Sequence, residues 1–120
     1  MNLTAIQELA AQQTAARAAA QRFADDVRRE FGDRVQWIRL YGSLARGDWM
    51  GPDESDVDVA IVLRDKAEVD VSRIIHLTTE HLLRTGFVFS PRVMTPQEFQ
   101  HLQDRELRLA RDILAEGRLL

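Results

Sequence analysis

Hydrophobic positions along the chain first follow a helical period and then a strand period. From residue 3 to residue 31, apolar residues recur at steps of three and four, and the many alanines favour a helix. Gly32 predicts the end of this helix. We expect the helix to pack on a sheet rather than to bind a partner, with a buried face made of Leu3, Ile6, Leu9, Ala16, Ala20, Phe23, Val27 and Phe31.

Three later segments have the alternation or the β-branched composition of strands, namely residues 35–41, 57–63 and 87–94. In the first strand we expect Ile38 and Leu40 on one face. The other face should carry Val35, Trp37 and Tyr41. Pro91 interrupts the third strand, which indicates an edge strand or a bulge.

Two further helices are predicted between and after these strands. One covers residues 69–85 and ends at Gly86, with apolar positions Ile74, Ile75, Leu77, Leu82 and Leu83. The other starts at a threonine cap, Thr95, with Pro96 in the first turn and Glu98 completing a capping box. It should reach about Ala115, end at Gly117 and bury Phe99, Leu102, Leu109, Ile113 and Leu114, leaving 118–120 as a short strand or tail. The element order predicts one α+β domain over residues 1–120, a small mixed sheet with helices packed on it.

Composition narrows the class of protein. The chain has 120 residues, is 45% hydrophobic and 29% charged, and contains no run long enough to span a membrane. No signal-peptide layout is present, so we expect a cytoplasmic protein. The formal charge of -3 and the scattered arginines argue against nucleic-acid coating. The chain has no cysteine, which excludes thiolate chemistry, and Lys66 is its only lysine, which argues against a Schiff-base mechanism.

The stretch from Leu40 to Leu63 is where candidate chemistry gathers. Asp56 and Asp58 are two residues apart, so on a strand they point to the same face, roughly 7 Å apart at the backbone. Alone, such a pair could cap helices or solvate a sheet edge. The Gly42-Ser43 turn upstream would offer backbone N–H groups and a hydroxyl to phosphate. Carboxylates opposite a phosphate cradle are suited to Mg²⁺, and the pattern indicates a joint metal and phosphate site.

Three other motifs fail on their spacing or composition. Gly42 and Gly47 have the glycine spacing of a P-loop, but Asp48 stands where lysine is needed. The acidic loop lacks the glycine and glutamate of an EF-hand. His76 and His81 are five residues apart, off one helical face, and are expected to be ordinary helix residues.

The residues Gly42-Ser43-x-Ala45-Arg46-Gly47, followed by Ser55-Asp56-Val57-Asp58-Val59, resemble the signature of the DNA polymerase beta-type nucleotidyltransferases. The chain's size, and residues 90–99 and 115–117, look like those of the minimal nucleotidyltransferases. The resemblance implies a polymerase beta-like palm fold, a nucleoside triphosphate substrate such as ATP, and Mg²⁺. It implies phosphate binding by Gly42 and Ser43, and catalytic metal binding by Asp56 and Asp58. Arg46 would neutralise phosphate or pair with Asp48.

The same resemblance implies transfer of a nucleoside monophosphate to a hydroxyl of a protein or small molecule. It also implies a HEPN-domain partner in a toxin–antitoxin pair, while a homo-oligomer stays open. The family's third carboxylate lies on the next strand, yet residues 87–94 contain no acid. Ser90 or Arg92 should lie nearest the aspartates instead, and Glu98 is already explained as a cap. The alternative is therefore an attenuated protein that binds nucleotide or a partner.

Overall fold

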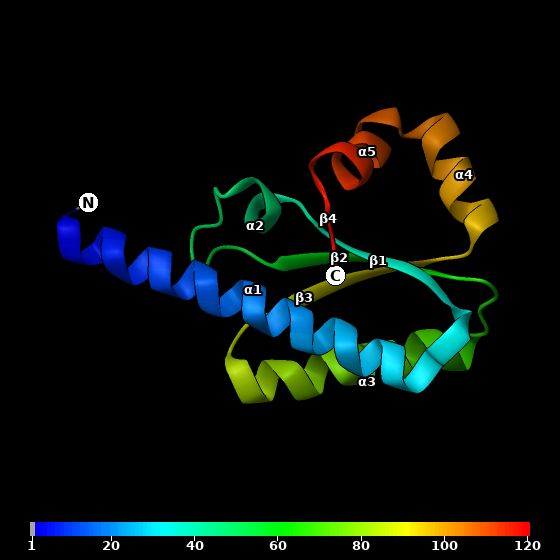
Figure 1. Cartoon of the computed structure of the whole chain (residues 1–120), viewed down its shortest axis with the longest axis horizontal. Coiled ribbons are helices and arrows are strands. Elements are labelled where there is room, and N and C mark those ends of the chain that lie inside the picture. The colour runs from blue at the N-terminus through cyan, green and yellow to red at the C-terminus, as the bar shows by residue number, and fades with distance from the viewer. Residues whose placement is uncertain (1) are drawn as a thin grey trace.

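The computed structural model describes residues 2–120, and its centre is a four-stranded sheet in the order β3-β2-β1-β4 (Figure 1). The strands are β1 (Val35–Tyr41), β2 (Val57–Leu63), β3 (Phe89–Met94) and β4 (Arg118–Leu119). β1 runs antiparallel to β2 and β4, while β2 and β3 are parallel. The expected small mixed sheet is confirmed, and residues 118 and 119 form a strand rather than a tail.

Helices cover both faces of this sheet. α1 (Leu3–Phe31) and α3 (Glu68–Thr85) lie on one face, as Figure 1 shows. α4 (Pro96–Arg105), α5 (Leu107–Arg111) and the π-helical turn η2 (Asp112–Glu116) lie over the other. The one-turn helix α2 (Ser43–Arg46) follows β1, and the 3-10 turn η1 (Gly32–Arg34) precedes it. Within residues 2–120 no helix has the length and apolarity to cross a bilayer.

β2 is the best buried strand because it receives packing on both sides. Its residues Val57, Val59, Ile61 and Leu63 belong to the core under α1 and α3. Ala60 and Val62 belong to a second core under α4 and η2. The alternation that the sequence predicted for this strand is confirmed. It leaves one polar position on the second face, Asp58, at the strand's beginning.

Alanines let α1 approach the sheet closely. Ala16, Ala19, Ala20 and Ala24 are fully buried, and Phe23 fills the space between them and β3, with its ring centroid 5.0 Å from that of Phe89. The N-terminal part of α1 extends beyond the sheet (Figure 1), and Leu3 and Ile6 there are exposed. The expected buried face of this helix is therefore confirmed only for its later turns.

Val35 lies on the opposite face of β1 from the one that the sequence predicted. The ladder between β1 and β2 shifts register between Val35 and Trp37, so Val35 joins Ile38 and Leu40 in the core under α1. Trp37 and Tyr41 pack with the second core, as expected. A β-bulge inserts one residue and turns every side chain before it to the opposite face, which explains the error.

The last helix is also not continuous. The backbone of Glu106 leaves the helical region (φ -122°, ψ 65°), which divides the segment into α4 and α5. Leu114, which lies in the π-helical turn η2, is 41% exposed instead of buried, whereas Ile113 is buried as expected. Smaller differences are that α3 starts at Glu68 and β3 at Phe89. Of the five apolar positions of α3, Ile74 and Leu77 are buried and Ile75, Leu82 and Leu83 are exposed. Pro91 lies on an edge strand, one of its two predicted settings.

Candidate active site

Gly42 and Asp58 meet where β1 turns into α2. Gly42 has a positive φ of 76°, and Asp58 pairs with the preceding residue, Tyr41, across the β1–β2 ladder. A Cβ built on Gly42 would overlap Asp58 Oδ2 and lie 3.2 Å from Asp58 Cγ. The carboxylate therefore lies directly against the turn. Glycine is required here for its conformation and for the space it leaves.

Asp56 lies beside this contact and is exposed, one residue before β2 begins. Ser90 Oγ of β3 donates a hydrogen bond of 2.9 Å to Asp56 Oδ2. Ser90 is also the register partner of Asp58 in the parallel β2–β3 ladder. The structure thus brings together Gly42, Asp56 and Asp58, and it places Ser90 next to the acids, as expected. Arg92 lies two pairs further along, opposite Ala60.

The electrostatics of Asp58 follow from its half-buried position. Burial raises the pKa of the Asp58 carboxyl, the negative charge of Asp56 raises it further, and Arg46 opposes both. Burial and the Asp58 charge also raise the pKa of the Tyr41 hydroxyl, which the guanidinium of Arg92 opposes. The unfavourable charge of the carboxylate pair would be relieved by a bound cation.

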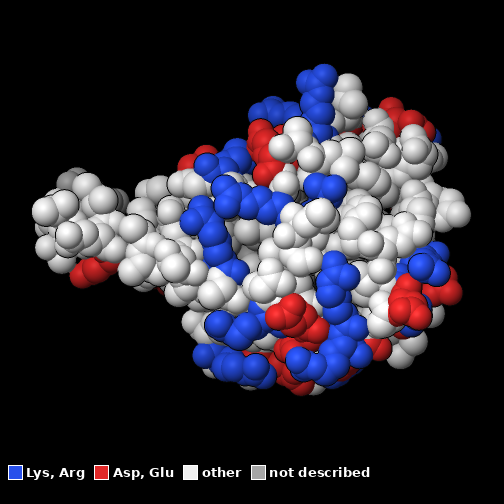
Figure 2. Space-filling model, in the orientation of Figure 1, with Lys and Arg blue, Asp and Glu red and all other residues white. Residues whose placement is uncertain are grey.

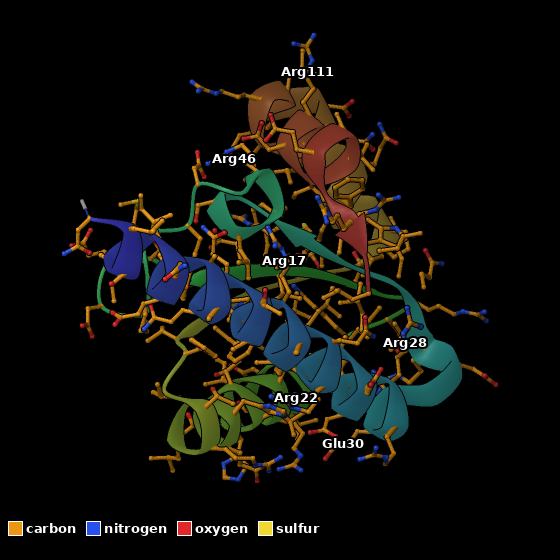
Figure 3. The ribbon with its side chains drawn as sticks, turned by 60° about the vertical axis from the view of Figure 1, so that its left-hand side comes forward. Arg17, Arg22, Arg28, Glu30, Arg46 and Arg111 are labelled. Carbon is orange, nitrogen blue, oxygen red and sulfur yellow. The ribbon has the colours of Figure 1, made fainter. Side chains whose placement is uncertain are left out.

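Arg46 was predicted either to bind phosphate or to pair with Asp48, and it forms ion pairs with Asp48 and with Glu116. Its guanidinium pairs with Asp48 Oδ2 at 3.5 Å and with Glu116 Oε2 at 3.4 Å. In Figure 3 it extends from α2 toward the C-terminal helical segment, whereas Arg111 of α5 points away from the body. The pairing with Asp48 is present, and phosphate binding by Arg46 stays a prediction. Glu116 was missed because it is distant in sequence, although it belongs to the Ala115-Glu116-Gly117 segment that carried part of the resemblance.

Buried contacts hold the loop between α2 and the acids in place. Trp49 is fully buried and packs against Phe87, with 5.7 Å between ring centroids. Gln13 Nε2 of α1 donates to the Trp49 carbonyl at 2.9 Å, and Arg17 Nη2 donates to the Leu44 carbonyl at 3.1 Å. Sequence reasoning missed this anchor. Its signal was a single large aromatic side chain inside a polar, glycine-containing loop.

Ser43 is the first residue of α2, and the other polar candidates lie elsewhere. At the start of a helix the first backbone N–H groups have no partner within the helix, so the turn can present them to an anion.

His76 pairs with Glu80 one turn away on the surface of α3, and His81 is buried with its Nε2 2.7 Å from Asp26 Oδ2. Both histidines belong to helix packing or surface pairs, as expected.

The donor set fits Mg²⁺ if substrate oxygens complete its coordination. Within residues 2–120 no three or more His, Cys, Asp or Glu side chains cluster as metal ligands. Mg²⁺ commonly binds through one or two carboxylates, with waters and substrate phosphates as the other ligands. Asp56 and Asp58 supply such a pair of hard oxygen ligands, and Asp58 lies directly against the Gly42 turn.

Comparisons with known proteins identify the family of this chain. The model of the nucleotidyltransferase domain family matches residues 20–120. A Methanocaldococcus jannaschii protein that carries the name "Putative protein adenylyltransferase" is 34% identical over 104 residues, which are 85% of this chain and 94% of that protein. Two solved structures are similar in fold. A "putative nucleotidyltransferase" from Sulfolobus solfataricus has a TM-score of 0.53 at 18% identity, over 99% of this chain and 87% of that one. A "toxin-antitoxin with AMP-PNP" has a TM-score of 0.56 at 17% identity, over 82% and 69%. The expected fold and family are therefore confirmed, and this chain belongs to the nucleotidyltransferase domain family as a minimal nucleotidyltransferase domain.

Proposed function

We propose that this protein transfers the nucleoside monophosphate of a triphosphate, with ATP as the substrate and Mg²⁺ as the metal, to a hydroxyl group of an acceptor protein. The observation that carries the proposal is the contact of Asp58 with the Gly42 turn, with Asp56 beside it. A metal ion held by these carboxylates would lie next to phosphates held by the turn. The similarity to a protein named as a protein adenylyltransferase supports ATP and a protein acceptor.

Each residue of the site has a distinct task in this proposal. Gly42, lacking a Cβ, lets the Asp58 carboxylate lie against the turn, and Ser43 would donate its hydroxyl and N–H to phosphate oxygens. Asp56 and Asp58 would hold Mg²⁺, which when bound polarises the phosphates, favours ionisation of the acceptor hydroxyl and stabilises the departing pyrophosphate. The acceptor hydroxyl loses its proton to water and its oxygen bonds to the α-phosphorus, while the bond from that phosphorus to the bridging oxygen breaks and pyrophosphate leaves. Arg46 keeps α2 in place through Glu116 and adds positive charge near Asp58.

A second candidate is a partner-binding protein with attenuated catalysis, the antitoxin of a HEPN-domain toxin. The observation that favours it is that Ser90 and Arg92 occupy the strand where the family has its third carboxylate. Without a carboxylate base the hydroxyl proton passes to water, which makes transfer slow. General-base assistance is worth about 10²–10⁴-fold in rate. The fold similarity to a toxin–antitoxin structure supports such a partner.

The test tracks the label from ATP labelled at the α- or the γ-phosphate. Acceptors are the protein encoded by a neighbouring gene and peptides with serine, threonine or tyrosine. We expect α-label, and not γ-label, on the acceptor, with its loss in Asp56→Asn/Asp58→Asn. Asp53→Asn, an exposed aspartate of the same loop, is the matched control and should behave as the wild type. Transfer of γ-label, or α-transfer that persists in the double variant, would contradict the proposed chemistry. Nucleotide binding without any transfer would favour the second candidate.

A further inference from the structure

A hollow next to the candidate active site lies between β3 and α4. Its volume is about 480 Å³, and its lining comes from the second half of β3 and from one side of α4. Met94, which is buried, and Leu102, which is half-buried, form the apolar part of this lining. In Figure 1, α4 rises from the end of β3 at the edge of the sheet, so the hollow lies at the sheet's open margin.

The polar part of the lining includes two guanidinium groups and one imidazole. Arg92, His101 and Arg105 line the hollow and are exposed. Throughout the part of the chain that the structure describes, Arg92 and Arg105 form no ion pair with a carboxylate, unlike Arg34, Arg46 and Arg73.

The acids of the lining only partly offset these cations. Glu98 Oε2 is paired with Lys66 Nζ at 2.8 Å, and its other oxygen accepts the Thr95 N–H at 3.2 Å. The positive charge of Lys66 therefore neutralises the negative charge of Glu98. Glu106, at the break between α4 and α5, is the remaining carboxylate of the hollow. The two guanidinium groups thus face one uncompensated acid, which favours an anionic ligand.

The position of the hollow relative to the aspartates separates it from the phosphate turn. Gly42 approaches Asp58 from the β1 side of β2. Ser90 and Arg92 flank β2 on the opposite side, because β3 is its other neighbour. Arg92 is two residues beyond Ser90 on the same face of β3, roughly 7 Å along the strand. A nucleotide held at Gly42 and an occupant of the hollow would therefore reach the aspartate pair from opposite sides.

We propose that the hollow binds the acceptor, and that its ligand is an acidic peptide segment in which an apolar or aromatic side chain neighbours carboxylates. This rests on the proposed transfer function and extends it to the recognition of the second substrate. The apolar side chain packs on Met94 and Leu102, while the carboxylates pair with Arg92 and Arg105. The acceptor hydroxyl is then presented to the aspartates from the β3 side.

Nucleic acid is the less favoured occupant. Its backbone binds to clustered cations along an extended track, whereas this chain has a net charge of -3 and the hollow offers two arginines. Figure 2 shows a group of blue side chains over α1 and α2, apart from α4, and mixed blue and red side chains at the lower edge of the face in view. The comparison with a protein named as a protein adenylyltransferase also favours a peptide.

Fluorescence anisotropy without nucleotide or metal tests the proposal directly. The probe is a short labelled peptide with one tyrosine between glutamates, and the comparison peptides carry glutamine or lysine in place of glutamate. Arg105→Glu removes one attraction and adds one repulsion, so we expect about fivefold weaker binding of the glutamate peptide. Arg108→Glu makes the same charge change on α5, outside the hollow, and should bind as the wild type. The lysine peptide should bind Arg105→Glu better than it binds the wild type.

The outcomes separate the hollow from the catalytic proposal. Equal weakening by Arg105→Glu and Arg108→Glu, or no preference for the glutamate peptide, would overturn the acceptor site. A single-stranded RNA that binds more tightly than the glutamate peptide, and depends on Arg105, would overturn the choice of a peptide. Thermal melts of both variants establish that they are folded. If the peptide binds as expected but no α-label reaches it, the transfer proposal fails and the hollow stands as a peptide site.

Discussion

Replacing Gly42 by alanine perturbs the candidate site at its most crowded point. The new Cβ would overlap Asp58 Oδ2 and lie 3.2 Å from Asp58 Cγ and 3.3 Å from its Cβ. Backbone movement at Gly42 is limited by its place between β1 and α2. Asp58 must therefore turn away from the position in which it faces the phosphate turn.

The size of the effect combines two costs. A non-glycine residue at φ 76° and ψ -155° is strained by about 1–3 kcal/mol, and a displaced Asp58 rotamer adds about 1 kcal/mol. Gly42→Ala should therefore lower the free energy of unfolding by about 2–4 kcal/mol. Gly86 is the matched control, because it has a positive φ of 80° but no atom within 4 Å of a built Cβ. Gly86→Ala should cost only the backbone strain, about 1 kcal/mol.

Two measurements separate folding from binding. Urea unfolding gives the free-energy difference, and calorimetry at a temperature where both variants are folded gives the affinity for ATP with Mg²⁺. We expect Gly42→Ala to weaken binding more than tenfold and Gly86→Ala to leave it unchanged. If folded Gly42→Ala binds ATP as the wild type does, the phosphates lie elsewhere and the reasoning from this contact is wrong.

Two further predictions concern the carboxylates. Ser90→Asp places an acid next to Asp56, so Mg²⁺-dependent transfer of α-label should rise by about tenfold or more. The uncharged Ser90→Asn should not raise it. Fast transfer by the wild type would refute the idea that catalysis is attenuated. Burial and the charge of Asp56 raise the pKa of Asp58, so the folded protein binds the carboxyl proton of Asp58 more tightly than the unfolded chain does. The free energy of unfolding should therefore fall as the pH rises from the ordinary aspartate pKa through the raised pKa. Without metal, Asp58→Asn should therefore melt at or above the wild-type temperature at neutral pH and lose that advantage in acid. Mg²⁺ with ATP should stabilise the wild type and not the variant. A variant that is less stable than the wild type at neutral pH without metal would contradict the raised pKa.

The elements could be predicted because their signals are local. The helical period of α1, the alternation in β2 and the Thr95–Glu98 capping box each lie within a few consecutive residues. The pairing of Asp56 and Asp58 also follows from the strand period. The same alternation in β3 predicted Ser90 or Arg92 nearest the acids, and the structure has Ser90 there.

The features that could not be predicted depend on residues that are distant in sequence or on single backbone irregularities. The bulge near Gln36 moves Val35 to the other face of the strand, and no glycine or proline in the sequence signals it. The break at Glu106 lies in a stretch of good helix formers. Glu116 reaches Arg46 across 70 residues, and Trp49 is buried only because α1 and Phe87 cover it. Such contacts exist only once the chain is folded.

Calorimetry of ATP binding with and without Mg²⁺ tests whether Asp56 and Asp58 hold a metal against phosphates at the Gly42 turn. We predict that wild-type affinity for ATP depends on Mg²⁺ and that Asp56→Asn/Asp58→Asn removes this dependence. The control Asp53→Asn should retain it. Equal Mg²⁺-dependent affinity in the double variant and the wild type would contradict the assignment of the metal site.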